Sequence, residues 1–199
     1  MKPGSTRFWR YVSGALALLS VAAAVAAARS QDATPAPAPR ASELTLAGLR
    51  PGRDTLAIAQ HRYGSKGIAN VSDGTKQWLD PCTGHAIMLE LAPNGVIQSV
   101  TISAIASEAG ACAGRRGDLL HEDQWQTGHG LHLGDTEDHV TEIYGDPGSS
   151  GPSVKGKHEL ELLYYAFDWA GSDVPQVMEV FCARDSGRVM EITLAYASL

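Results

Sequence analysis

The chain has 199 residues and a formal net charge of −6, a length that allows one domain or two small ones. With 44% hydrophobic and 19% charged residues, it is neither a disordered polymer nor an array of membrane spans. Three cysteines are too few for a disulfide-rich miniature fold, so the composition predicts a globular protein.

Residues 1–29 have the pattern of a secretory signal. Lys2, Arg7 and Arg10 precede an apolar run over residues 12–28, which ends in three alanines. A basic start, an apolar centre and small residues at the end are typical of a cleaved export signal. We therefore expect a periplasmic or extracellular protein. The alternative is a signal anchor that stays uncleaved in the membrane, which would be the chain's one membrane contact.

Residues 30–41 contain an alternation of proline and alanine over residues 35–39, a pattern typical of an extended tether without hydrogen-bonded structure. Residues 1–29 contain four basic residues and no acidic one, so cleavage would leave a chain still more acidic than the whole. Phosphate backbones are bound by clustered Lys and Arg, and this acidic chain has no long basic cluster. Nucleic acid is therefore not an expected partner.

An Asp-Thr pair and a Tyr-Gly pair recur at the same separation, first over residues 54–64 and again over residues 135–145. An Asp or Thr side chain can cap the first free amides of a helix, and glycine permits the left-handed residue that ends one. The two segments therefore predict two short helices, ending at Tyr63 and Tyr144.

Alternating apolar segments follow each helix and predict strands. Tight-turn sequences at residues 93–95 and 185–187 separate the second and third strand of each set. The expected strands cover residues 77–80, 86–91 and 96–105 in the first set, and residues 159–169, 177–184 and 189–197 in the second.

These elements predict an α+β fold of two tandem units, each a helix plus a three-stranded antiparallel meander, with the helices on one face of a sheet. The first unit covers residues 42–112, a linker follows at residues 113–129, and the second unit covers residues 130–199.

Residues 130–147, which read Gly-Leu-His-Leu-Gly-Asp-Thr-Glu-Asp-His-Val-Thr-Glu-Ile-Tyr-Gly-Asp-Pro, resemble the opening helix of the small outer-membrane-assembly lipoproteins, the BamE/SmpA-like family. A tandem pair of such units resembles the beta-lactamase-inhibitor-protein architecture. The resemblance implies helices covering one face of a continuous antiparallel sheet whose other face meets a partner protein. It implies no catalytic residues, and this chain lacks the lipidated cysteine.

Aromatic residues of the second strand set are the candidate partner-binding residues. Tyr165 and Trp169 share one side of a strand, and Phe181 alternates with the row of Met178 and Val180. Exposed aromatic side chains are favoured anchors for protein partners. The pattern does not decide which sheet face is buried, so a second interpretation places Tyr165 and Trp169 against the helices.

Cys82 follows the first strand and Cys112 follows the third, which places both at the same end of an up-and-down meander. In an oxidising compartment we expect them to form a disulfide. Cys182 lies in the middle of a strand, where we expect a buried free thiol.

Residues 121–135 are rich in His and carboxylates, including His129 and His132, but their spacing matches no closed metal site. Residues 151–157 have the spacing of a phosphate-binding loop, yet they follow a helix and precede a strand, so we expect a mobile loop instead. We expect no catalytic residues, metal or cofactor, and the alternative is a small hydrolase or metal-binding protein using the His-rich linker.

Overall fold

A computed structural model describes residues 40–65, 68–80, 82–105 and 125–196. The expected signal at residues 1–29 and nearly all of the tether lie outside these residues, as does most of the linker. The described residues belong to one compact unit, Ala38–Leu199. No helix among them is long and apolar enough to cross a membrane.

Both expected helices are present and end at the expected tyrosines. They are α2 (Leu56–Tyr63) and α3 (Glu137–Tyr144), and Gly64 and Gly145 follow them with φ values of 84° and 77°. The hydroxyl of Thr136 accepts a hydrogen bond from the backbone of His139 and so caps α3. The aspartates of the motif have a different role, because Asp54 and Asp135 accept backbone hydrogen bonds in the turns before the helices.

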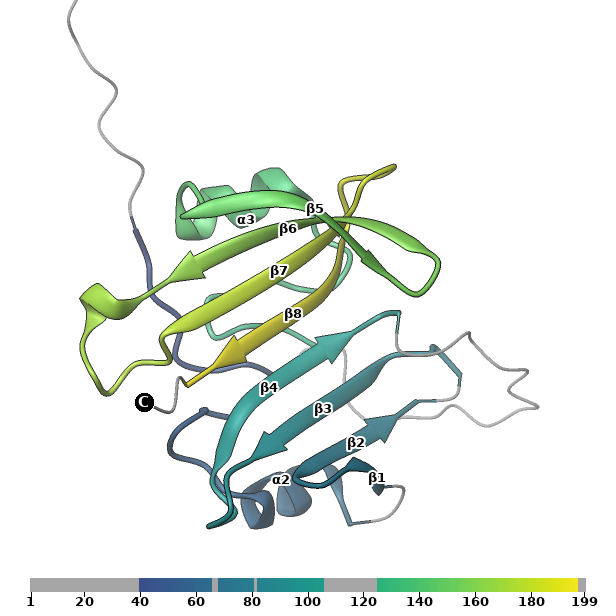
Figure 1. Ribbon diagram of the computed structural model, residues 1–199, viewed down its shortest axis with the longest axis vertical. Coiled ribbons are helices and arrows are strands. Elements are labelled where there is room, and N and C mark those ends of the chain that lie inside the picture. Colours follow the sequence, from purple (N-terminus) through teal and green to yellow (C-terminus); the bar gives the residue numbers. More distant parts are fainter. Residues whose placement is uncertain (1–39, 66–67, 81, 106–124, 197–199) are drawn as a thin grey trace, which may run out of the picture. The chain divides into compact units, whose positions relative to one another are not determined.

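The strands form one antiparallel sheet in the order β1-β2-β3-β4-β8-β7-β6-β5 (Figure 1). The prediction of two units with three strands each is therefore wrong. The strands are β1 (Ile68–Ser72), β2 (Thr75–Leu79), β3 (Ala86–Leu91), β4 (Ile97–Ser103), β5 (Ser149–Lys155), β6 (His158–Ala166), β7 (Val177–Ala183) and β8 (Val189–Ala195). A short 3-10 helix, η2 (Asp168–Ala170), follows β6.

The two strands that the sequence pattern missed, β1 and β5, are the edges of this sheet. Strand β5 contains Gly151 and Pro152 and is mostly exposed, so it lacks the apolar alternation of a strand buried on one face. Proline is tolerated at a sheet edge because its nitrogen need not donate to a neighbouring strand. The expectation of a mobile loop over residues 151–157 is therefore wrong for residues 151–155.

Strands β4 and β8 join the two halves of the sheet, β1–β4 and β5–β8. They pair through five residue pairs, from Ser99 with Ala195 to Ser103 with Glu191. Val100 faces Leu194 and Ile102 faces Ile192, and all four side chains are fully buried. Because this pairing continues the hydrogen-bonded ladder, strands from both halves share one core.

That core lies between the sheet and the helices. Ala59 and Tyr63 of α2 and Val140 and Tyr144 of α3 are buried in it, together with alternate residues of the central strands. The strand residues of this core are Trp78, Ile87, Leu89, Ile97, Val100, Ile102, Leu163, Tyr165, Met178, Val180, Cys182, Val189, Ile192 and Leu194. Both helices therefore cover one face of the sheet, and we call the opposite side the open face.

Candidate functional site

The open face carries the strand residues that alternate with the core residues. Three pairing rows cross its middle strands. They are Glu90, Ser99, Ala195 and Val177; then Met88, Thr101, Thr193 and Glu179; and then Ala86, Ser103, Glu191 and Phe181. Most of these side chains are small or polar, unlike the large aliphatic ones on the helix side. The middle of the open face is therefore lined mainly by short or polar side chains.

The polar groups of this face bond to one another across strands. The hydroxyls of Thr101 and Thr193 lie 2.9 Å apart on β4 and β8. The hydroxyl of Ser99 donates a 3.0 Å hydrogen bond to the carboxylate of Glu90. These bonds hold the small side chains close to the sheet, with Ser99 and Thr101 only 5% exposed.

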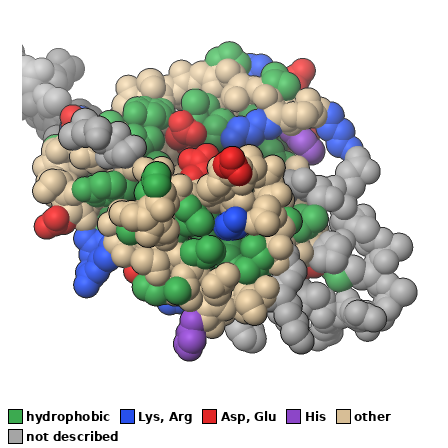
Figure 2. Space-filling model, turned by 60° about the horizontal axis from the view of Figure 1, so that its bottom comes forward, with side chains coloured by type: hydrophobic (Ala, Val, Ile, Leu, Met, Phe, Trp, Pro, Cys, Tyr) green, Lys and Arg blue, Asp and Glu red, His purple; other side chains and the backbone are tan. Residues whose placement is uncertain are grey.

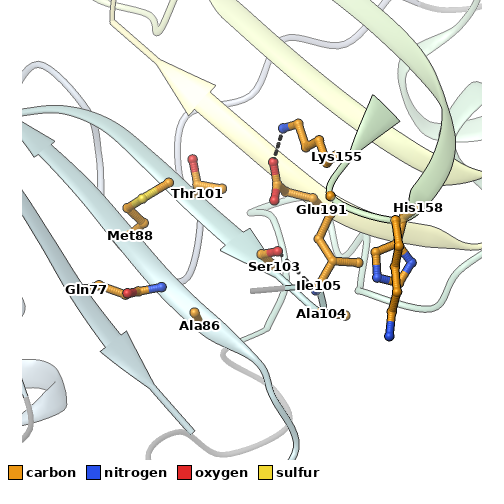
Figure 3. Close-up of a pocket in the computed structure, with 12 residues that line it drawn as sticks. Gln77, Ala86, Met88, Thr101, Ser103, Ala104, Ile105, Lys155, His158 and Glu191 are labelled. Carbon is orange, nitrogen blue, oxygen red and sulfur yellow. Dashed lines mark hydrogen bonds and ion pairs between the residues drawn. The ribbon is translucent and has the colours of Figure 1, made fainter. Parts of the chain in front are cut away.

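A cavity of about 530 Å³ lies on this face, between strands β2–β4 and the turn that joins β5 to β6 (Figure 3). Met88, Ile105 and Ala104 supply apolar surface, and Gln77 and Thr101 supply polar groups. The remaining lining residues are Ala86, Ser103, Lys155, Gly156, Lys157, His158 and Glu191. Pockets of about 300–1,000 Å³ hold most small ligands, and this volume also accommodates side chains of a protein partner.

Lys155 closes one side of the cavity. Its ammonium group forms an ion pair with Glu191 (Figure 3). The same group lies 3.4 Å from the centre of the Phe181 ring. A cation over an aromatic face is attracted by the negative potential of the ring. Phe181 and Glu191 are cross-strand partners on β7 and β8, and they are 4% and 8% exposed. One lysine therefore contacts two nearly buried side chains of the open face.

Three carboxylates lie on the open face, from Glu90, Glu179 and Glu191. Figure 2 shows acidic side chains gathered in the middle of the displayed face, with a basic side chain next to them. Within the described strands, Lys155 forms an ion pair with one of these carboxylates, that of Glu191. The middle of this surface therefore carries a net negative charge.

A second polar cluster lies on the helix side, around the buried carboxylate of Glu43. Its two oxygens accept hydrogen bonds from the backbone amides of Leu44, Thr45 and His129, and the ring of His129 lies 3.0 Å away. The hydroxyl of Tyr144 donates a 2.6 Å hydrogen bond to the same carboxylate. All of these groups are paired within the protein, so the cluster is a structural link rather than a ligand site.

The hydrogen bonds decide the ionisation of Glu43. Burial by itself raises the pKa of this carboxyl, but donors from Thr45, Tyr144 and His129 outweigh that effect and hold the pKa below its ordinary value of 4.5. Burial and the neighbouring Glu43 raise the pKa of Tyr144 far above its usual range. Glu43 is therefore ionised and Tyr144 is a neutral donor at neutral pH.

The three predicted partner-binding residues lie in different places. Tyr165 is 4% exposed and belongs to the core, where its hydroxyl donates to the carbonyl of Gly145, so it lies against the helices, as the second interpretation of the sequence placed it, and is not an exposed partner-binding residue. Phe181 lies on the open face as expected, but it is covered by Lys155. Trp169 is 53% exposed in η2, beside a smaller cavity of about 170 Å³. The three side chains do not form one surface.

The sequence interpretation missed Lys155, Glu191, Gln77 and Met88. Lys155 lies in the segment that we expected to be a mobile loop. Glu191 lies next to Ile192 in β8, and period-two alternation was a usable signal, because it separates this carboxylate from the apolar row of Ile192 and Leu194. The contact between Lys155 and Glu191 depends on the course of the edge strand, which the local pattern does not reveal.

His129 and His132 do not meet in a metal site. His129 lies against Glu43, and His132 lies 3.7 Å from Asp135. Among the described residues no group of three or more His, Cys, Asp or Glu side chains could hold a metal ion. The other His and carboxylates at the start of this His-rich segment, His121, Glu122 and Asp123, lie outside the described residues.

Cys182 is buried and free, as expected. Burial, together with Glu137 and Glu161, raises the pKa of its thiol to about 12, so the thiol stays protonated. Cys112, the expected disulfide partner of Cys82, lies outside the described residues, and their pairing stays a prediction.

No family model matches the chain, and no curated protein matches its sequence. Solved structures that are similar to it include the following three. A DUF4309 family protein, YjgB of Bacillus subtilis, has 9% identity and a TM-score of 0.46, over 78% of this chain and 88% of that one. An extracellular protein containing an SCP domain from Bacillus anthracis has 5% identity and a TM-score of 0.40, over 71% and 42%.

A cysteine-rich secretory protein from Staphylococcus aureus has 10% identity and a TM-score of 0.41, over 80% of this chain and 49% of that one. The chain thus spans less than half the length of the last two proteins. Identities and TM-scores this low do not assign the chain to any of these families. None of the three is described as a BamE/SmpA-like or beta-lactamase-inhibitor protein.

Proposed function

We propose that this chain is an exported protein-interaction module that binds a segment of a partner protein on the open face of its sheet. Residues 1–29 support export through their signal pattern. The resemblance to outer-membrane-assembly lipoproteins and beta-lactamase-inhibitor proteins suggests two kinds of partner, an envelope-assembly complex and an extracellular enzyme.

The observation that carries this proposal is the cavity of about 530 Å³ on the sheet face that the helices leave uncovered. Met88 and Ile105 provide apolar contact surface, and Gln77 and Thr101 provide hydrogen-bonding groups beside it. Protein interfaces combine an anchor side chain in a pocket with a polar surround. The cavity could accept such an anchor side chain, and the neighbouring residue rows of the open face would supply the polar surround.

A peptide library displayed against residues 30–199 tests the proposal. We expect selected peptides to bind the wild-type protein and to lose binding when Gln77→Trp fills the cavity. Ile58→Trp is the matched control, because Ile58 is 44% exposed on α2, on the covered side of the sheet. Peptides that bind both variants equally, or a library that yields no binder, would contradict the proposal.

A further inference from the structure

Lys155 reaches its partners from the far edge of the sheet. Strand β5 is separated from β8 by β6 and β7, so the two strands lie about 14 Å apart in a flat sheet. That distance exceeds the reach of a lysine side chain, yet Lys155 contacts Glu191 on β8 and Phe181 on β7. The end of the β5–β6 hairpin therefore curls over the open face, and Lys155 joins it to the middle of the sheet.

The hairpin end has little other packing. Strand β5 alternates exposed and half-buried residues, and no residue of it belongs to the core. Val154, beside Lys155, is 70% exposed, and Gly156 in the turn has a φ of 59° with open space around it. Segments with few buried apolar contacts open at low free-energy cost. Lys155 can therefore leave Glu191 without disturbing the core.

Phe181 and Glu191 together form a binding site for one cationic group. The ring face and the carboxylate both attract positive charge, and both are nearly buried, so the attraction acts with little competition from water. If Lys155 left without replacement, Glu191 would be a buried carboxylate with no counter-charge, which is costly. Another cation in the same position removes that cost.

We infer that Phe181 and Glu191 are a recognition site for a basic side chain of the partner, which Lys155 occupies in the free protein. This inference rests on the proposed function, since the partner segment must lie on the open face. An incoming Lys or Arg replaces Lys155 between the ring and the carboxylate. Glu90 and Glu179, on the same face, attract further basic residues of the segment.

A defined peptide tests the inference. The probe is an acetylated and amidated hexapeptide that alternates threonine and lysine, so that an extended chain presents its lysines on one side. Control peptides replace lysine with norleucine, which keeps the chain length without the charge, or with glutamate. We expect the lysine peptide to bind at least about tenfold more tightly than either control, and to weaken as salt is added.

Variants of the protein locate the effect. Lys155→Met keeps much of the side-chain length but frees the site, so it should tighten lysine-peptide binding by about tenfold, while Glu191→Gln should weaken it by at least as much. Lys76→Met is the charge-matched control. The ammonium group of Lys76 on β2 donates a hydrogen bond to Asn70 on β1, and Lys76 is the cross-strand partner of the core residue Leu89, away from the open face. Glu142→Gln on α3, 74% exposed, is the control for Glu191. Circular dichroism checks that each variant is folded.

The outcomes separate this inference from the proposed function. Equal binding of the lysine and norleucine peptides, or no gain with Lys155→Met, overturns the inference. If library peptides without basic residues still bind and Gln77→Trp still blocks them, the proposed function stands. Hydrogen exchange adds a direct measurement, because displacement of Lys155 should speed exchange at the β5–β6 turn when the lysine peptide binds. Unchanged or slower exchange there contradicts displacement.

Discussion

The hydroxyl of Tyr144 donates a 2.6 Å hydrogen bond to the carboxylate of Glu43, which lies 101 residues earlier in the chain. This bond ties the start of the described chain to the end of α3 and, through His129, to the segment before α3. A charge-assisted hydrogen bond of this kind contributes more stability than a neutral one.

Tyr144→Phe should lower the free energy of unfolding by about 2 kcal/mol, because it leaves a buried carboxylate without one of its donors. Urea denaturation followed by circular dichroism measures the change. Tyr196→Phe is the matched control, since the hydroxyl of Tyr196 donates to Ser172 in an exposed position. An equal loss of unfolding free energy in both variants would show that the hydrogen bond from Tyr144 to Glu43 contributes no more stability than an exposed tyrosine hydrogen bond.

Stability should depend on pH through Glu43. Its pKa is lower in the folded protein than its ordinary value of 4.5, so the folded state favours the ionised form. The resulting stability is fully present above the unfolded pKa and is lost as the pH falls through the lower, folded pKa. The measurement is the unfolding free energy of the wild type and of Glu43→Gln, from about pH 7 to about pH 3.

At neutral pH, Glu43→Gln should cost about 3 kcal/mol, because an amide group then faces backbone donors that the carboxylate accepted. The difference between the two proteins should shrink as the pH falls. A gap that stays constant over this range would show that ionisation of Glu43 contributes nothing to stability.

Gly128 is required by the same cluster. A Cβ atom at this position would lie 2.6 Å from Oε1 of Glu43 and 2.6 Å from the hydroxyl oxygen of Thr45. We expect Gly128→Ala to destabilise the protein by about 2 kcal/mol, because the carboxylate must move away from its donors. Gly151→Ala, which has open space around it, should change stability little in the same denaturation experiment.

Local patterns in the sequence predicted the elements that bury one face. The tyrosine and glycine at each helix end, and the apolar alternation of β3, β6, β7 and β8, correspond to the structure within a few residues. Edge strands bury too little for such a pattern, so β1 and β5 were missed. The joining of β4 to β8 depends on pairs such as Val100 with Leu194, whose separation along the chain no local period encodes.

The candidate site was harder to predict than the core. Period-two alternation identifies which residues share a face, and it placed Phe181 opposite Met178 and Val180 correctly. It did not decide which face the helices cover, so the position of Tyr165 stayed open between the partner-binding face and the core. The cavity itself depends on how far the β5–β6 hairpin curls over the sheet, and this curvature comes from tertiary packing.

The three aromatic residues should respond differently to replacement by alanine. Tyr165→Ala and Phe181→Ala should each lower the free energy of unfolding by about 3 kcal/mol, because both side chains are buried. Trp169→Ala should stay within about 0.5 kcal/mol, because Trp169 is half-exposed in η2. Chemical denaturation of the three variants checks the order. A large loss for Trp169→Ala would place that residue in the core.

Thiol chemistry should distinguish the cysteines. We predict a disulfide between Cys82 and Cys112. Because it closes the loop between these two residues, it should stabilise the folded protein by roughly 3–4 kcal/mol. The buried, protonated thiol of Cys182 should react with an alkylating reagent only after unfolding. Peptide mass spectrometry of the exported protein, alkylated before and after denaturation without reductant, should find one modified cysteine, Cys182, and a peptide pair linked through the other two. Three modified cysteines would contradict the disulfide, and modification of Cys182 in the native protein would contradict its burial.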